Sequence, residues 1–394
     1  MKIAKKVLKT IGVLLGFIVV IVLGYIIYLY ASYHRIEDNK SLSVESHTKT
    51  KQTLTTGKQY SAITYNIGFG AYTPDFSFFM DGGKSSWAKS KKSVISTVNG
   101  AGELVKSYDP DFALIEEVDL NSTRSYHVNE YSILKKCLKN YDTVFAQNYD
   151  SAFLFYPFTQ PHGSSKSGLA LFSKYSITDS LRRSFPVSTS FSKFFDLDRC
   201  YSVSRIPADG GKELVVYSVH MSAYGNSDEI REGQINMLVS DLEKEYKAGN
   251  YVLCGGDFNH DLKASEDDSE NRESWAYPFP RKKLPNEFSF CIDQLSDEEK
   301  ENLWKELETK WTETLSVNDY RENQITLNSV IAQALNRGPL KEQYLVFRKD
   351  PSGTPVKNKK ERFSYLYSLK ADSDGKIQTL YKKTRERLLK NIAV

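Results

Sequence analysis

The sequence predicts an α/β fold preceded by a single transmembrane helix. Four short runs rich in β-branched and aromatic residues each end in a polar side chain, as buried strands do where they lead into a site. Residues 296–311 carry a capping box and an apolar stripe, which together predict a helix. Residues 11–30 contain no charge and form a separate element. With 40% hydrophobic and 13% aromatic residues, the 394-residue chain can bury the core of one large domain.

The N-terminal element is predicted to anchor the chain in a membrane. Residues 11–30 have the length that crosses the hydrocarbon layer as a helix, and they exceed the core of a typical signal peptide. Basic residues before this stretch predict, by the positive-inside rule, a cytoplasmic N-terminus and an extracytoplasmic remainder. These residues are Lys2, Lys5, Lys6 and Lys9. We therefore assign residues 1–36 to a single-pass anchor in the cell membrane. The alternative is a cleaved secretory signal, with Ala31-Ser32 as its candidate cleavage site.

The composition of the residues after the anchor limits the kinds of molecule that they are expected to bind. Residues 37–58, rich in Ser, Thr and Lys, predict an exposed stalk. The net charge of +4 comes from two basic ends, so residues 41–300 are net acidic. An acidic region does not favour nucleic-acid binding, although a bound cation changes the local sign. The four cysteines show no Cys-x-x-Cys pair, which excludes a zinc ribbon and leaves a disulfide between Cys200 and Cys291 open. Nothing in the sequence indicates an oligomeric state.

The first two strand runs each deliver candidate site residues. Residues 61–68 alternate β-branched and aromatic side chains and lead to Asn66. Residues 111–119 form an apolar run that ends in the carboxylates Glu116 and Glu117. Side chains at the end of a buried strand lie at the mouth of a core, where binding and catalysis usually occur.

The other two runs complete the pattern. Residues 214–221 end in His220. Residues 251–254 form an apolar strand followed by two glycines, which let the backbone approach another group closely. The polar residues Asp257, Asn259, His260 and Asp261 come next. Aspartate can bind a hard cation or orient a water, and asparagine can donate hydrogen bonds to developing negative charge. Taken alone, this string also fits a plain turn.

In their order and spacing these runs resemble the endonuclease/exonuclease/phosphatase superfamily, from about residue 59 to residue 295. Two further segments add to the resemblance, residues 167–175 as a supporting strand and residues 231–238 as the helix after the histidine strand. The resemblance implies a four-layered α/β sandwich over residues 59–304, with two packed, mainly antiparallel sheets flanked by helices. It also implies hydrolysis of phosphoric esters, the chemistry of nucleases, phospholipases and phosphatases.

The resemblance further implies a magnesium site. Glu117 corresponds to the metal carboxylate of the family, and Asn66 helps to hold the metal. Mg²⁺ suits such a site because hard cations prefer oxygen ligands, and Mn²⁺ is a possible substitute. Glu116 stands where the family often has glutamine. It is either a residue that surrounds the site or a solvated neighbour.

By the same resemblance, three residues act on the phosphate. His220 hydrogen-bonds and partly neutralises it, and Asn259 stabilises the pentacoordinate phosphorus. Asp257 orients the water or protonates the leaving group. His260 and Asp261 either surround the site or belong to a plain loop. The substrate is a phosphate ester, in a lipid headgroup, a nucleotide or a nucleic acid.

The chain departs from the family at its C-terminal end. The family closes its site with Ser-Asp-His, whereas none of the six histidines here follows His260. Ser373 and Asp374 are followed by Gly375, in a turn-like segment. Residues 305–394 are an atypical basic segment with three explanations: an altered reading frame or fusion, a divergent end on a non-catalytic relative, or a base supplied from elsewhere, such as His260.

Two functions follow from this departure. The first is a membrane-anchored, Mg²⁺-dependent phosphoric-ester hydrolase. The alternative is a catalytically impaired binding protein, displayed at the membrane on the same scaffold. A third hypothesis is that the basic tail is a polyanion-binding module, although such runs of charged residues most often form solvated faces.

Overall fold

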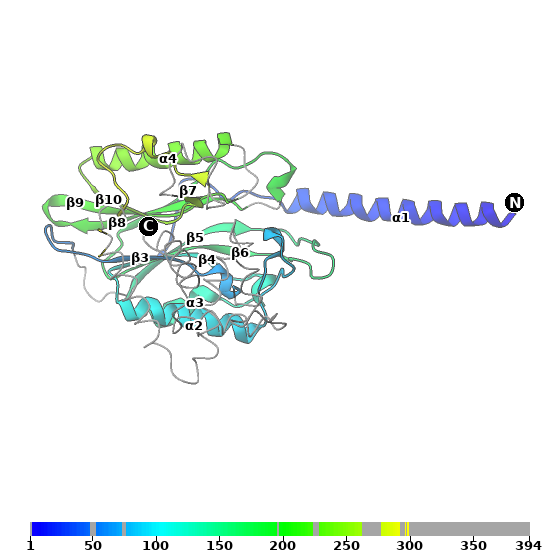
Figure 1. Cartoon of the computed structure of the whole chain (residues 1–394), viewed down its shortest axis with the longest axis horizontal. Coiled ribbons are helices and arrows are strands. Elements are labelled where there is room, and N and C mark those ends of the chain that lie inside the picture. Colours follow the sequence, from blue (N-terminus) through cyan, green and yellow to red (C-terminus); the bar gives the residue numbers. More distant parts are fainter. Residues whose placement is uncertain are drawn as a thin grey trace, which may run out of the picture.

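A four-layered α/β sandwich follows one long N-terminal helix (Figure 1). The computed structural model describes residues 2–47, 53–72, 76–194, 197–223, 228–261, 277–291, 296 and 298. The basic segment 305–394 and nearly all of the expected helix 296–311 lie outside the described residues. The predicted fold class is confirmed, since two sheets pack face to face and helices cover their outer faces.

Each sheet has five strands, of which one neighbouring pair is parallel and the others are antiparallel. The first sheet has the order β2-β5-β6-β4-β3, and its parallel pair is β3 and β4. Its strands are β2 (Val44–Glu45), β3 (Ala62–Asn66), β4 (Phe112–Asp119), β5 (Asp142–Asp150) and β6 (Lys166–Ser173). Two of the four strands predicted from the sequence are β3 and β4.

The second sheet has the order β1-β7-β8-β9-β10, and its parallel pair is β9 and β10. Its strands are β1 (Lys40–Ser41), β7 (Asp179–Ser184), β8 (Cys200–Ala208), β9 (Lys212–His220) and β10 (Tyr251–Asp257). A short parallel pair, β11 (His260–Asp261) and β12 (Tyr277–Pro278), follows β10. Because each sheet ends in a parallel pair, the C-terminal ends of β3, β4, β9 and β10 lie at one end of the sandwich.

Helices α2 (Lys91–Tyr108) and α3 (Glu130–Cys137) cover the first sheet, and α4 (Asp228–Lys247) covers the second. The side chain of Ser90 caps the first turn of α2 by accepting a hydrogen bond from the backbone N–H of Ser93. The buried face of α2 follows the helical period, with Val94, Val98, Ala101 and Val105 turned to the sheet. Short 3₁₀ helices lie in the connections: η1 (Gly68–Gly70), η2 (Phe79–Asp81), η3 (Thr123–Ser125), η4 (Phe191–Phe194), η5 (Asp209–Gly211) and η6 (Arg281–Lys283).

The core between the sheets is apolar, and strand periodicity explains its composition. On β4, Leu114 packs between the sheets, whereas its neighbours Ala113 and Ile115 face the helices. Leu171 of β6 and Val216 of β9 join Leu114 in the central layer. Each such side chain contributes about 1.5–3 kcal/mol when it leaves water. This rigid interior fixes the ends of the strands that carry the site.

The predicted stalk, residues 37–58, is more closely tied to the domain than the sequence suggests. Within this segment β1 pairs with β7 and β2 pairs with β5, so its backbone extends one edge of each sheet. Leu54 is buried, and its backbone N–H donates to Pro207 O. The side chains of β1 are exposed, which is why the composition of this stretch resembles a linker.

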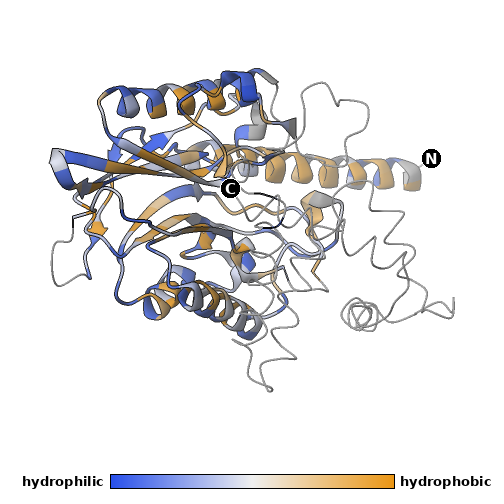
Figure 2. Ribbon diagram, turned by 60° about the vertical axis from the view of Figure 1, so that its left-hand side comes forward, coloured by the Kyte–Doolittle hydropathy of each residue, from blue (hydrophilic) through white to orange (hydrophobic). Residues whose placement is uncertain are grey.

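Helix α1 (Lys2–Ser32) extends away from the sandwich, and it is apolar after its first turns, which carry four lysines (Figure 2). Residues Lys5–Ser32 are long and apolar enough to cross a membrane, and no residue of their most apolar window is buried. The predicted anchor therefore forms the expected helix. The four cysteines are free: Cys200 is buried, Cys291 is exposed, and the two form no disulfide.

Candidate active site

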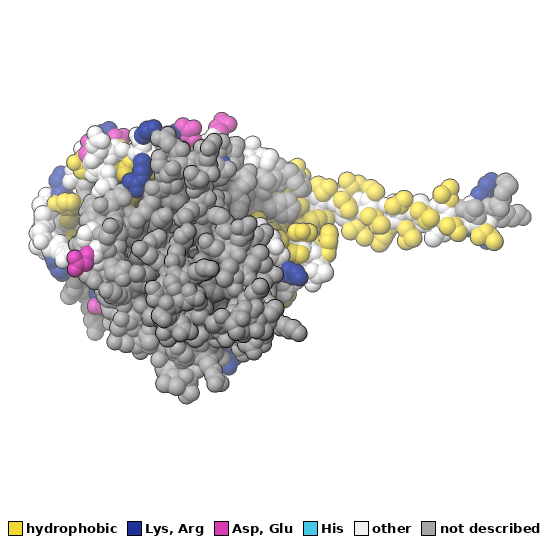
Figure 3. All heavy atoms as spheres, in the orientation of Figure 1, with side chains coloured by type: hydrophobic (Ala, Val, Ile, Leu, Met, Phe, Trp, Pro, Cys, Tyr) yellow, Lys and Arg dark blue, Asp and Glu magenta, His cyan; other side chains and the backbone are white. Residues whose placement is uncertain are grey.

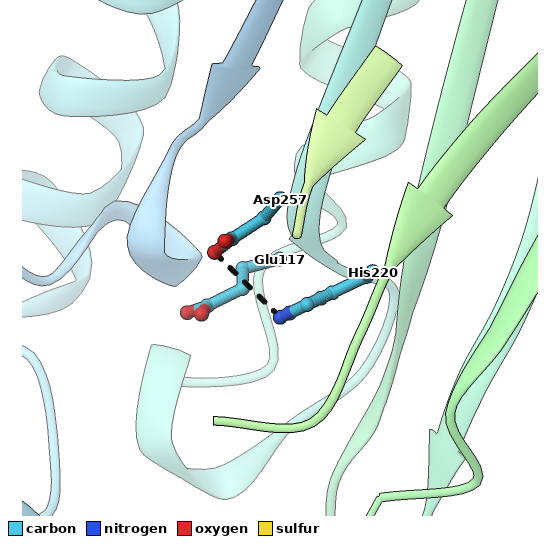
Figure 4. Close-up of side chains that lie close together, drawn as sticks. All are labelled: Glu117, His220 and Asp257. Carbon is cyan, nitrogen blue, oxygen red and sulfur yellow. Dashed lines mark ion pairs between the residues drawn. The ribbon is translucent and has the colours of Figure 1, made fainter. Parts of the chain in front are cut away.

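The predicted site residues of four strands meet at one end of the sandwich. In register, Asn66 of β3 pairs with Glu116 of β4, and Asp257 of β10 pairs with His220 of β9. One ligand atom each from Glu117, His220 and Asp257 lies within 4.8 Å of the other two. Figure 4 shows these three side chains converging from separate strands. Residues that are far apart in the sequence thus form one cluster.

Asn66 bridges the two carboxylates of this cluster. Its Nδ2 donates to Glu117 Oε1 at 3.1 Å and to Asp257 Oδ2 at 2.8 Å. Its Oδ1 accepts a hydrogen bond from the backbone N–H of Gly68 at 2.9 Å, which fixes the orientation of the amide. Asn66 therefore positions the carboxylates through its nitrogen. This arrangement agrees with a supporting role, because its oxygen is already engaged.

A bulge in β4 directs Glu117 into the site. The pairing of β4 with β6 shifts register between Ile115 and Val118, and Glu117 adopts the left-handed conformation, φ 55°. For a residue with a side chain this backbone is strained, and such strain concentrates at functional sites. Burial raises the pKa of Glu117, and the guanidinium of Arg124 opposes that rise. The bulge thus presents a half-buried carboxylate at the end of the strand.

Glu116 is fully buried, so it is not a solvated neighbour. Burial and the nearby charge of Asp257 raise the pKa of Glu116 well above its usual range. Thr64 Oγ1 donates to its carboxylate at 3.4 Å. Glu116 lies outside the three-residue cluster.

His220 is buried beside Asp257. Its Nε2 lies 3.8 Å from Asp257 Oδ2, and its Nδ1 lies 3.4 Å from Asn148 Nδ2. Burial and the charge of Arg199 lower the pKa of His220 to about 3, against the opposing effect of Asp257. The imidazole is therefore neutral near pH 7. As a neutral ring it can act as a hydrogen-bond partner for a phosphate oxygen.

The turn after β10 holds Asp257 and Asn259. Gly256 has φ 131°, and a Cβ there would lie 2.1 Å from Val219 O, so no larger residue fits beside β9. The backbone N–H of Asn259 donates to Asp257 Oδ1 at 2.9 Å. Asn259 Nδ2 donates to Met221 O at 2.9 Å, which uses one of its two amide protons. The double glycine therefore allows the close approach that the sequence predicted.

His260 is not brought into the cluster. Its Nδ1 lies 2.6 Å from Phe258 O, and its ring packs against Phe279. Burial lowers the pKa of His260. Asp261 belongs to β11 by its backbone, and its side chain lies outside the described residues. His260 is therefore not a member of the three-residue cluster.

Two buried arginines lie near the cluster, and neither was predicted from the sequence. Arg124 donates to both carboxylate oxygens of Asp119, at 2.8 and 3.1 Å, and its guanidinium lies 3.9 Å from the ring centre of Phe69. Arg199 is buried, and among the described residues its Nε and Nη1 have no hydrogen-bond partner. Both charges act on Glu117, since both oppose the rise in its pKa. The sequence gives no signal for either residue, because an isolated arginine is more often a surface residue.

The donor set fits a divalent cation. Glu117 and Asp257 supply carboxylate oxygens, the ligands that hard cations prefer, and His220 supplies a neutral nitrogen. Asn66 holds the two carboxylates close although like charges repel. A cation between them would relieve that repulsion.

Solved structures that are similar to this chain have low sequence identity. An endonuclease/exonuclease/phosphatase from Beutenbergia cavernae DSM 12333 is 16% identical over 46% of this chain and 43% of that chain, with a TM-score of 0.34. ANGEL2, a 2',3'-cyclic phosphatase, is 14% identical over 59% of each chain, with a TM-score of 0.37. The human Nocturnin catalytic domain is 16% identical over 56% of this chain and 68% of that chain, with a TM-score of 0.36. The chain thus covers less than two thirds of the first two structures. No curated protein matches the sequence.

The sequence itself matches one family over more than half of its length. The Endonuclease/Exonuclease/phosphatase family matches residues 63–292, a range that contains Asn66, Glu117, His220 and Asp257. Members of this family are phosphoesterases that generally use divalent metals. The chain belongs to the endonuclease/exonuclease/phosphatase family.

Proposed function

We propose that the protein is a membrane-anchored, Mg²⁺-dependent phosphoric-ester hydrolase that acts on phosphodiesters outside the cytoplasm. The convergence of Glu117, His220 and Asp257 within 4.8 Å, held by the Asn66 bridge, supports this proposal most strongly. Phosphodiester hydrolysis needs a polarised phosphate, an oriented water and help for the leaving oxygen. The cluster and its neighbours offer residues for each of these tasks.

Glu117 would hold the cation, and Asn66 would keep its carboxylate in place. Mg²⁺, or Mn²⁺ as a substitute, supplies charge stabilisation for the phosphoryl oxygens when bound. Asp257 is the residue best placed to orient the water or to protonate the leaving oxygen, because Asn66 and the backbone of Asn259 fix its two oxygens. His220, as a neutral ring, would hydrogen-bond a phosphoryl oxygen. The second amide proton of Asn259 would bind the pentacoordinate phosphorus group.

Arg199 would bind a non-bridging phosphate oxygen. A buried guanidinium with two nitrogens that lack a partner among the described residues is costly, and a phosphate anion would accept hydrogen bonds from its donors. Its effects on the pKa values of His220 and Glu117 indicate that its charge acts on the cluster.

We expect Arg199→Lys, which keeps the charge but loses the fork, to lower kcat/KM about tenfold or more. Initial rates on an activated aryl phosphodiester would measure this loss. Arg205→Lys is the matched control, since Arg205 already pairs with Glu213 and Glu245. Equal rates for wild type and Arg199→Lys would remove Arg199 from the phosphate site.

The anchor would set the side of the membrane on which the domain lies. Lysines before residues 11–30 favour a cytoplasmic N-terminus, and the described part of α1 is apolar enough to span a bilayer. We expect protease added to intact cells to digest the region after Tyr60. Digestion only after lysis would reverse the orientation, and release of the whole domain into the medium would indicate a cleaved signal.

The alternative is a catalytically impaired binding protein, and a specific observation favours it. No histidine follows His260 in the sequence, and His260 packs against Phe279 outside the cluster. A missing general base typically costs about 10²–10⁴-fold in rate. The remaining contacts should still support slow turnover of an ester that needs little leaving-group help.

The full chain in detergent micelles tests the two functions with an activated aryl phosphodiester. The hydrolase proposal predicts a low rate that depends on Mg²⁺ and that EDTA abolishes. A rate equal to that of buffer at saturating Mg²⁺ would leave the binding-protein function.

A further inference from the structure

Helix α1 does not end free of the domain, because its last two turns contact the loop between β5 and β6. Tyr25 Oη donates to Phe153 O at 3.2 Å, and the backbone N–H of Phe153 donates to Tyr28 Oη at 3.0 Å. The rings of Tyr25 and Phe155 meet edge to face at 5.2 Å. Leu29 is buried against Leu154 and Phe194. We call residues 153–158 the aromatic loop.

The segment after α1 is clamped to the same end of the domain. The fully buried Arg182 donates to the backbone carbonyls of Ile36 and Glu37 at 3.3 and 3.1 Å. Arg35 pairs with Asp198 at 3.1 Å. These bonds restrict the movement of the domain relative to α1. The same side of the domain therefore faces any membrane that α1 crosses.

The length of α1 places the aromatic loop at membrane depth. The uncharged stretch of α1, residues 11–30, is about 30 Å long at about 1.5 Å per residue, which matches the hydrocarbon layer of about 30 Å. Tyr25 and Tyr28 lie in the last turns of this stretch, near its boundary with the interfacial layer, where tyrosines are enriched. A loop hydrogen-bonded to these tyrosines lies at the same boundary.

The aromatic loop exposes apolar side chains at this depth. Phe155, Tyr156 and Phe158 are 50%, 61% and 83% exposed. In space-filling view, hydrophobic side chains continue from the helix onto the adjoining edge of the domain (Figure 3). Exposed aromatic residues next to a membrane span are typical of interfacial anchoring. In water alone this exposure is unfavourable, whereas the headgroup layer accepts it.

The active site lies at the same end of the sandwich. Asn148, which contacts His220, is on β5 shortly before the aromatic loop. Asp119, at the end of the strand that carries Glu117, pairs with Ser167 at the beginning of β6. Arg199 directly follows Asp198, the partner of Arg35. The loops around the site therefore adjoin the elements that contact α1.

We propose that the aromatic loop inserts into the interfacial layer of the bilayer and that the substrate is the phosphoester headgroup of a membrane lipid. The second part rests on the proposed hydrolase function, and the first rests only on α1 spanning a membrane. Docking of the loop beside α1 holds the rim of the active site against the headgroups. A lipid phosphoester would then reach the site at high local concentration, whereas a soluble ester would not gain from docking.

Loop insertion is tested by tryptophan fluorescence of the full chain in vesicles of phosphatidylcholine and phosphatidylglycerol with brominated acyl chains. Bromine quenches only emission from residues in contact with the bilayer. We expect Phe158→Trp to add quenched emission above the background of the four native tryptophans. Tyr251→Trp is the matched control, because Tyr251 is 45% exposed at the opposite end of β10 from Asp257. Equal quenching of the two added tryptophans would overturn insertion.

The lipid substrate is tested with the Tyr156→Ser/Phe158→Ser double variant. We expect wild type to release headgroup product from the same vesicles without bromine, and the double variant to do so about tenfold or more slowly. Both proteins should hydrolyse a soluble aryl phosphodiester at the same rate, which also shows that the variant is folded. Hydrolysis of the soluble ester without the lipid by wild type would overturn the lipid substrate and leave the hydrolase function. Hydrolysis of neither would overturn both.

Discussion

Replacing Asp257 by alanine is expected to lower Mg²⁺-dependent hydrolysis by about 10²–10⁴-fold, the usual contribution of a positioned acid or base. Asp257 lies where both carboxylate oxygens are held, by Asn66 and by the backbone of Asn259. The variant keeps Gly256, which allows the close approach of β10 to β9, but it loses the hydrogen bond from the backbone of Asn259. Initial rates on an activated aryl phosphodiester measure the loss. His220→Ala should show a comparable loss.

His260→Ala is the control for this prediction. Its ring packs against Phe279, so we expect the variant to keep nearly all of the wild-type activity. If His260→Ala alone destroyed a robust activity, His260 would be the base that replaces the missing C-terminal histidine.

Glu117→Gln is expected to remove most of the stabilisation that Mg²⁺ gives to the protein. A ligand at one hundred times its Kd raises the free energy of unfolding by about 2.7 kcal/mol when it binds only the folded state. Glutamine keeps the size of the side chain but removes the charge that attracts the cation. Thermal unfolding of the full chain in micelles, with Mg²⁺ and with EDTA, measures the difference.

The change in unfolding temperature that Glu117→Gln causes in the absence of metal distinguishes a metal ligand from a structural residue. Burial raises the pKa of Glu117, and Asp257 adds to that rise, so the charged carboxylate is destabilising in the absence of a cation. Glu117→Gln should therefore unfold at the same or a higher temperature than wild type in EDTA, and at a lower temperature in Mg²⁺. Glu103→Gln, on the outer face of α2, should behave as wild type in both. An unchanged Mg²⁺ shift in Glu117→Gln would remove Glu117 from the metal site.

The sequence predicted the strands that carry the site because their pattern is local. β3, β4, β9 and β10 are short apolar runs that end in polar residues, and each was recognisable without its neighbours. The meeting of these four ends required only that the strands share two packed sheets. For this reason Asn66, Glu117, His220 and Asp257 could be proposed together from the sequence.

Other features depend on tertiary contacts and could not be predicted. The polar composition of residues 37–58 predicted a stalk, but the backbone of β1 and β2 completes two sheet edges, which composition does not encode. Glu116 is buried by its partners, although glutamate is usually exposed. Arg199 is a candidate because it is buried and because two of its nitrogens lack a partner among the described residues, and neither property is visible in the sequence.

The contact between α1 and the aromatic loop also depends on the tertiary structure and could not be predicted from the sequence. The sequence predicted the helix from its length and hydropathy, but the loop is separated from Tyr25 by more than one hundred residues. Phe155, Tyr156 and Phe158 carry no periodic pattern that would indicate a membrane segment. Only the fold shows that they lie beside the end of the span.

We propose that water attacks phosphorus at the cluster of Glu117, His220 and Asp257, and hydrolysis in ¹⁸O-labelled water tests this proposal most directly. The full chain in micelles is given an activated aryl phosphodiester and Mg²⁺, and the products are analysed by mass spectrometry. We predict one ¹⁸O in each phosphomonoester released, at a rate that EDTA and Asp257→Ala abolish. Label in the aryl alcohol, or no turnover above that of buffer, would contradict the account.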